Sequence, residues 1–160
     1  MDSDTKLLLE RAENELDLAK VIFILTENKN IQEGVFHLDK TQTFYSSVIS
    51  HSYYCIFYSA KAYLTSKKVI TKAPEEHKKT LEEFRKFVET GVVDKELLVL
   101  YEDVLVKAEN LLGIFKTEKK KRGEFTYQKL AQANKEPASQ SLENAKVFFR
   151  NIYNLCESSS

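Results

Sequence analysis

Residues 44–64 read FYSSVISHSYYCIFYSAKAYL, and this stretch decides the fold. It contains neither Gly nor Pro and is rich in aromatic and small side chains. Its aromatic residues also favour strands, but a run of this length without a turn signal is too long for a strand. We therefore predict a helix that ends near Ser66. At 3.6 residues per turn, its broad apolar face contains Tyr45, Val48, Ile49, Ser52, Tyr53, Ile56, Ala60, Tyr63 and Leu64.

Apolar groups also lie outside that face, at Phe44, Phe57 and Tyr58. A helix that is apolar on most sides is typical of a buried position. We therefore expect the central helix to lie in the middle of a bundle or at a subunit interface. Small residues would let neighbouring backbones approach it closely, and these are Ser50, Ser52, Ser59, Ala60 and Ala62.

The length and composition favour one soluble helical domain over residues 1–160. The chain has only four Gly and two Pro, which is too few for the many turns of an all-β domain. Its 24 basic and 24 acidic residues balance, so no overall positive field favours nucleic acid. The acidic start and the lack of a long apolar run predict neither a signal peptide nor a membrane span. We expect a cytoplasmic protein in which Cys55 and Cys156 are buried thiols.

Four further segments show apolar residues at helical spacing. We predict helices over residues 4–27, 74–90 and 94–118, and a last helix that begins between Pro137 and Ser141. Residues 28–43 would form a connection with a helical turn at 31–36, and residues 119–136 would be irregular. The predicted fold is all-α, an antiparallel up-and-down bundle of four to five helices. In the last helix the expected core stripe is Leu142, Ala145, Phe149, Ile152 and Cys156.

Several residues have the chemistry of helix ends. Asp2, Ser3 or Asp4 would cap the first helix, and Thr41 or Thr43 would cap the central helix. The helix after it would begin at Pro74 and end near Gly91. We expect the next helix to be capped by Asp94.

No familiar catalytic or metal-binding motif occurs in the chain. It has no Gly-rich phosphate loop, no His-Glu-x-x-His and no Cys pair with metal spacing. His37, His51 and His77 are isolated from one another in sequence, and the roles of His37 and His77 stay open. The sequence therefore predicts neither a metal site nor a cofactor.

Two features are candidates for function. His51 lies beside the small-residue face of the central helix, three residues before Tyr54, and is either a hydrogen-bonded rim histidine or a proton donor or RNA contact. The run of residues 119–127 mixes bases with aromatics, so Lys121, Arg122 and Tyr127 could hold phosphates and stack bases. The alternative for this run is a solvated loop that contributes to solubility.

Residues 50–64 resemble the second-helix motif of HEPN domains, which usually reads Ser-Arg-x-Tyr-Tyr-Ala-x-Phe-His-Ala-Ala-x-Ala-Leu-Leu. Three weaker matches follow the same order along the chain. Leu9, Ala12 and Ala19 are similar to the first helix of the family, and His77 followed by Phe84 is similar to its third helix. Residues 122–127 are similar to an Arg-x-x-x-x-Tyr segment before the last helix.

The resemblance implies a four- to five-helix bundle that is commonly a homodimer. Many members are toxins of prokaryotic toxin–antitoxin pairs, often beside a small nucleotidyltransferase, and many cut RNA without a metal. Their catalytic signature is Arg followed after four to six residues by His. After Arg122 the corresponding positions are Tyr127, Gln128 and Lys129, and the Arg and His of the central motif are here His51 and Tyr58.

The resemblance thus implies an RNA- or nucleotide-binding protein, or a metal-independent endoribonuclease with a degenerate motif. Arg122 would stabilise charge, and His51 would supply acid–base chemistry, because an unperturbed Tyr, with a pKa of about 10, is a poor base. Tyr54, Tyr127 and Lys121 would contact the substrate. The alternative is a non-catalytic helical module for dimerisation or partner binding.

Overall fold

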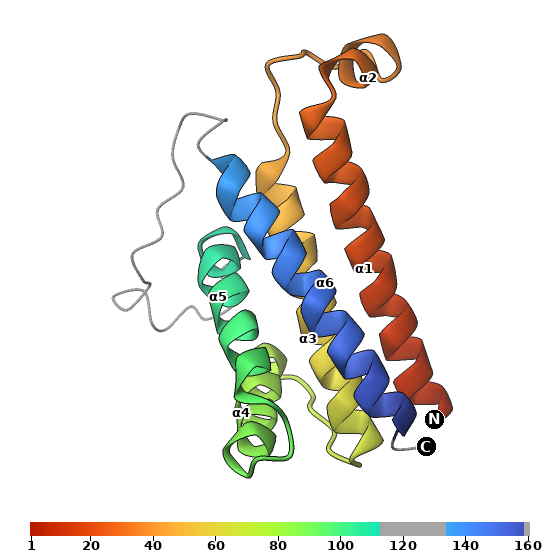
Figure 1. Cartoon of the computed structure of the whole chain (residues 1–160), viewed down its shortest axis with the longest axis vertical. Helices are drawn as coiled ribbons and strands as arrows, with labels where there is room; N and C mark the ends of the chain where they lie inside the picture. Colours follow the sequence, from red (N-terminus) through yellow and green to blue (C-terminus); the bar gives the residue numbers. More distant parts are fainter. Residues whose placement is uncertain (113–133, 159–160) are drawn as a thin grey trace.

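The computed structural model describes residues 1–112 and 134–158, and every regular element in these ranges is a helix (Figure 1). The prediction of an all-α bundle is therefore confirmed. In chain order the helices are α1 (Ser3–Glu27), α2 (Lys29–Gly34), α3 (Tyr45–Ser66), α4 (Glu76–Glu89), α5 (Lys95–Leu112) and α6 (Lys135–Ser158).

The four long helices α1, α3, α5 and α6 alternate in direction, as predicted for an up-and-down bundle (Figure 1). The diagonal pair α3 and α6 packs across the middle, and α3 contacts α1, α4, α5 and α6. The shorter α4 packs on the lower half of α3 and on α5, and α2 closes the upper end of α1. The helix predicted to be central therefore is central.

Burial in α3 follows the predicted face. All nine residues of that face are buried, the most exposed being Tyr45 at 6%. Phe57 lies outside the face but is buried as well, because α4 brings the ring of His77 to 4.0 Å from its ring. Burial on most sides of this helix is what the sequence predicted.

Small side chains let α3 and α6 approach closely. The Sγ atom of Cys55 in α3 lies 4.0 Å from the main-chain oxygen of Ala145 in α6, and both residues are completely buried. Cys156 is also buried, and neither cysteine forms a disulfide. A larger side chain at Ala145 would have to push the two central helices apart.

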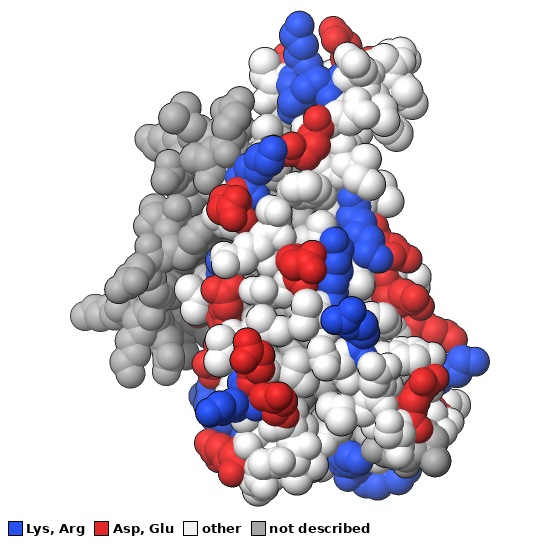
Figure 2. Space-filling view, viewed as in Figure 1, with Lys and Arg blue, Asp and Glu red and all other residues white. Residues whose placement is uncertain are grey.

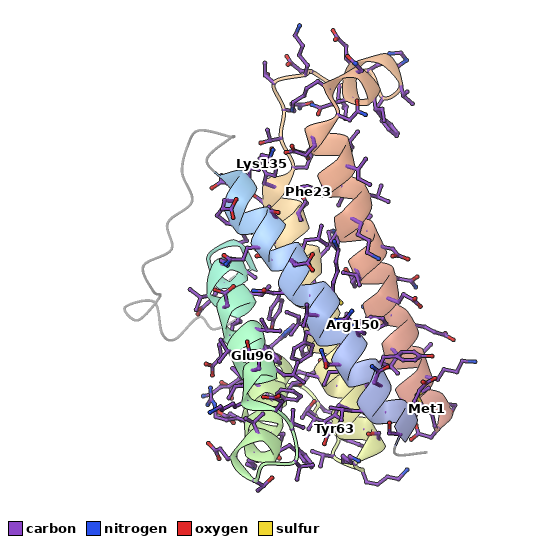
Figure 3. The ribbon with its side chains drawn as sticks, in the orientation of Figure 1. Met1, Phe23, Tyr63, Glu96, Lys135 and Arg150 are labelled. Atoms are coloured by element: carbon purple, nitrogen blue, oxygen red, sulfur yellow. The ribbon has the colours of Figure 1, made fainter. Side chains whose placement is uncertain are left out.

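Three helix starts differ from the prediction. α4 begins at Glu76 rather than Pro74, because Glu75 has a φ of 59° and so is not helical. No side chain caps α3, since Thr41 bonds to Asp39 and neither threonine is the N-cap residue. α6 begins at Lys135, before the predicted range. The Lys135 amine donates a hydrogen bond of 2.6 Å to the Glu27 carboxylate of α1. Figure 3 shows Lys135 at the upper end of α6.

The predicted roles of three residues at helix ends are confirmed. Asp2 caps α1, Asp94 accepts a hydrogen bond from the main chain of Glu96, and Gly91 has the positive φ of 75° expected after a helix end. The turn expected at 31–36 is the helix α2, which begins at Lys29 and includes Gly34. In α6 the fully buried ring is Phe148, while Phe149, predicted for the core, is only partly buried. Residues 113–133 lie outside the described residues. They include most of residues 119–136, the segment that we expected to be irregular.

Within the described residues, no helix is both long and apolar enough to cross a membrane. The face of the bundle around α6 carries basic and acidic side chains side by side, with uncharged surface between them (Figure 2). That face therefore offers no large area of one charge to a nucleic acid.

Candidate functional site

One side of α3 remains open to solvent. Both α1 and α4 pack on α3, but these two helices do not contact each other. The side of α3 between them is partly exposed, whereas the residues on either side of it are buried. We call this set the α3 stripe; its spacing of three, four and three residues places it on one side of the helix, and it consists of His51, Tyr54, Tyr58 and Lys61.

At the upper end of the α3 stripe, His51 pairs with Glu15 of α1. The His51 Nδ1 atom lies 2.6 Å from the Glu15 Oε2 atom, and both side chains are mostly shielded, at 28% and 21% exposed. An ionised carboxylate can only accept, so Nδ1 donates the hydrogen bond. In the neutral ring the other nitrogen, Nε2, is then the acceptor and can take up a proton.

The middle of the α3 stripe is aromatic and carries a cation. The rings of Tyr54 and Tyr58 are stacked, with centroids 6.2 Å apart. The Arg11 guanidinium of α1 lies over Tyr58, 4.1 Å from the ring centroid. Burial raises the pKa of Tyr58; the charge of Arg11 opposes this effect and the charge of Glu15 adds to it. Arg11, Glu15 and Tyr58 therefore lie close enough to interact electrostatically.

At the lower end, Lys61 forms an ion pair with Glu76, the first residue of α4. The Lys61 amine also lies 5.7 Å from the Phe57 ring centroid. Next to this pair is an open pocket of about 290 Å³. Its lining is mixed apolar and charged, and includes Leu8 and Lys72.

His77, whose role the sequence left open, belongs to the core packing. Its ring stacks on Phe57, and its Nδ1 atom lies 2.9 Å from the Tyr53 hydroxyl. Burial is the main effect on the pKa of His77 and lowers it. Glu76 and Lys61, the charged groups beside it, act in opposite directions on that pKa. His77 therefore resists protonation and holds α4 against α3.

The structure brings together only part of the predicted site. His51 and Tyr54 are neighbours on the α3 stripe, as their spacing predicted. Arg122, Tyr127 and Lys121 lie outside the described residues, so their predicted roles stay predictions. His37 is exposed in the connection after α2.

Sequence reasoning missed Arg11, Glu15 and Glu76. Arg11 and Glu15 are four residues apart on α1 and so share one side of that helix, but nothing in the sequence showed that this side borders His51. The antiparallel register of α1 and α3 supplies that information: Lys68 reaches Asp2 at one end, and the main chain of Phe44 bonds to Thr26 at the other.

Among the described residues, no group of three or more His, Cys, Asp or Glu side chains could hold a metal ion. No protein-family model matches the chain, and no curated protein matches it.

We predict that His77 makes stability depend on pH. Because its folded-state pKa is lowered, the unfolded chain protonates first as the pH falls below about 6.5. The free energy of unfolding should then decrease until the folded ring also protonates. In His77→Gln this part of the pH dependence should disappear, and the lost packing and hydrogen bond should cost about 1–3 kcal/mol at neutral pH.

The measurement is urea unfolding of both proteins across this pH range. His37→Asn is the matched control, since it removes an exposed histidine and Asn tolerates the positive φ of 55° at that position. A wild-type profile that His77→Gln leaves unchanged in shape would contradict the packing role.

Proposed function

We propose that this chain is a HEPN-like RNA- or nucleotide-binding protein of toxin–antitoxin type that acts as a metal-independent endoribonuclease with a degenerate motif. The family assignment is supported by the resemblance of residues 50–64. The observation that carries the function is the α3 stripe together with Arg11 of α1. They place a carboxylate-bound histidine, two stacked tyrosines and two cations on one side of the bundle.

Binding would use the tyrosines and the cations together. A nucleobase can stack on Tyr54, whose ring already stacks on Tyr58. Arg11 presents a guanidinium at the same place, and its planar fork suits the oxygens of a phosphate. This combination favours single-stranded RNA, whose bases are free to stack, over a duplex.

The reaction would require a base for the 2′-hydroxyl, an acid for the leaving oxygen and a cation for the phosphorane. His51 carries the one imidazole of the α3 stripe, and histidine is the commonest general acid or base in enzymes. Arg122 remains a candidate for the cation, with Lys121 and Tyr127 as candidates for substrate contacts. From the resemblance we further propose a cytoplasmic homodimer and a nucleotidyltransferase-type antitoxin as partner.

A second candidate function is a non-catalytic interaction module. The observation that favours it is the exposure of large apolar side chains on the upper part of α1 and just after α2. Val21 and Ile24 are 60% and 59% exposed, and Val35 and Phe36 are 63% and 57% exposed. Such a surface suits a protein partner better than RNA.

We expect RNA binding to depend on Tyr54. Removal of a stacked aromatic costs about 1–3 kcal/mol per base, so Tyr54→Ala should weaken binding of a short single-stranded RNA about 5- to 150-fold. Tyr153→Ala is the matched control, because Tyr153 is a partly exposed tyrosine on α6. Fluorescence anisotropy at two salt concentrations measures both effects. Equal affinities for all three proteins would contradict binding on the α3 stripe.

We also expect the wild type to cut a mixed RNA pool in the presence of EDTA, and Arg122→Ala to lose this activity. Removal of one group that stabilises charge in the transition state typically lowers a rate about 100- to 1,000-fold. Gel analysis of products over time measures the cleavage. Absence of cleavage by both proteins would instead favour the interaction module.

A further inference from the structure

We propose that Glu15, His51 and Arg11 form an acid–base centre for cleavage of RNA phosphodiesters, in which Glu15 positions His51. The choice of RNA as substrate rests on the function proposed above. The centre itself rests on contacts between α1 and α3. It assigns roles to two residues, Glu15 and Arg11, that the family resemblance does not include.

The pairing of Glu15 with His51 fixes which nitrogen can act. The 2.6 Å contact uses Nδ1 as donor, so the neutral ring keeps its lone pair on Nε2. A carboxylate bound to one ring nitrogen fixes both the tautomer and the orientation of the ring. Because the two side chains come from helices packed along their length and are mostly shielded, the ring has little freedom to turn.

Arg11 is placed to bind a phosphate beside the pair of Glu15 and His51. It is one turn from Glu15 on α1, about 6 Å along the helix axis. On α3, Tyr54 separates His51 from Tyr58, the residue beneath the Arg11 guanidinium. The guanidinium lies over that ring, 4.1 Å from its centroid, and its planar fork carries five N–H donors that suit a phosphate. A phosphate above Tyr54 would therefore lie between the guanidinium and the imidazole.

The step that these groups support is an internal transesterification. Nε2 of His51 takes the proton of the ribose 2′-hydroxyl, and the 2′ oxygen forms a bond to phosphorus. The bond from phosphorus to the 5′ oxygen of the next nucleotide breaks, and that oxygen takes a proton from water. The products are a 2′,3′-cyclic phosphate and a 5′-hydroxyl, and the imidazolium then returns its proton to solvent. Arg11 stabilises the negative charge on the phosphorane oxygens.

The positioning role of Glu15 can be tested without RNA. Long-range proton–nitrogen correlation spectra of the histidine rings report which nitrogen carries the proton. In the wild type, neutral His51 should carry it on Nδ1, and Glu15→Gln should lose this preference because an amide can also donate. Glu13→Gln is the matched control, since it removes the same charge from an exposed position on the same helix. Neutral His51 found protonated on Nε2 in the wild type would overturn the proposal.

Cleavage in the presence of EDTA then tests the reaction. We expect Glu15→Gln to lower the single-turnover rate about 10- to 100-fold and His51→Ala to lower it about 100- to 10,000-fold, while Glu13→Gln cuts at the wild-type rate. Arg11→Ala should also be slow, with partial recovery in Arg11→Lys. A substrate with 2′-deoxyribose at the cut site should not be cleaved.

Two kinds of failure are distinguishable. If the wild type cuts RNA and Glu15→Gln or His51→Ala cuts it equally fast, the centre is wrong while the proposed function stands. If the wild type does not cut RNA although His51 carries its proton on Nδ1, the proposed reaction fails and the centre fails as an RNA-cutting site.

Discussion

The fold depends on the burial of α3. Four other helices pack on it, and its apolar and small residues are covered on nearly every side. Between His51 and Lys61, only the line between α1 and α4 is partly exposed. Chemistry from this middle part of the helix must therefore occur on the α3 stripe, so the packing that stabilises the bundle also defines its candidate site.

Charges at the edge of such a core must be paired, and this requirement shapes the α3 stripe. His51 and Lys61 are both shielded by more than two thirds, and each has a carboxylate partner from a neighbouring helix. Shielded ion pairs contribute little net stability, because desolvation offsets most of the attraction. Replacement of such a pair by apolar side chains is often neutral or even stabilising, so stability alone does not account for the polar choice.

The sequence predicted the fold well because the information is local. Apolar spacing identified the buried face of α3, and the short-range chemistry of Asp2 and Asp94 identified two helix starts. The starts of α4 and α6 were missed, since α4 begins only after a left-handed Glu75 and the first turn of α6 is tied to α1 through Lys135 and Glu27. The candidate site was harder. The contact of Glu15 with His51 depends on the register between two helices, which no residue spacing reveals, and Lys121, Arg122 and Tyr127 lie outside the described residues.

We expect this protein to bind its ligand on the α3 stripe. The most direct test is to follow the backbone amide signals of isotope-labelled protein during titration with a short single-stranded RNA. The largest shifts should fall around residues 51–61 of α3 and residues 11–15 of α1. Shifts confined to the exposed apolar surface around Val21 and Phe36, or the absence of any shift, would contradict it.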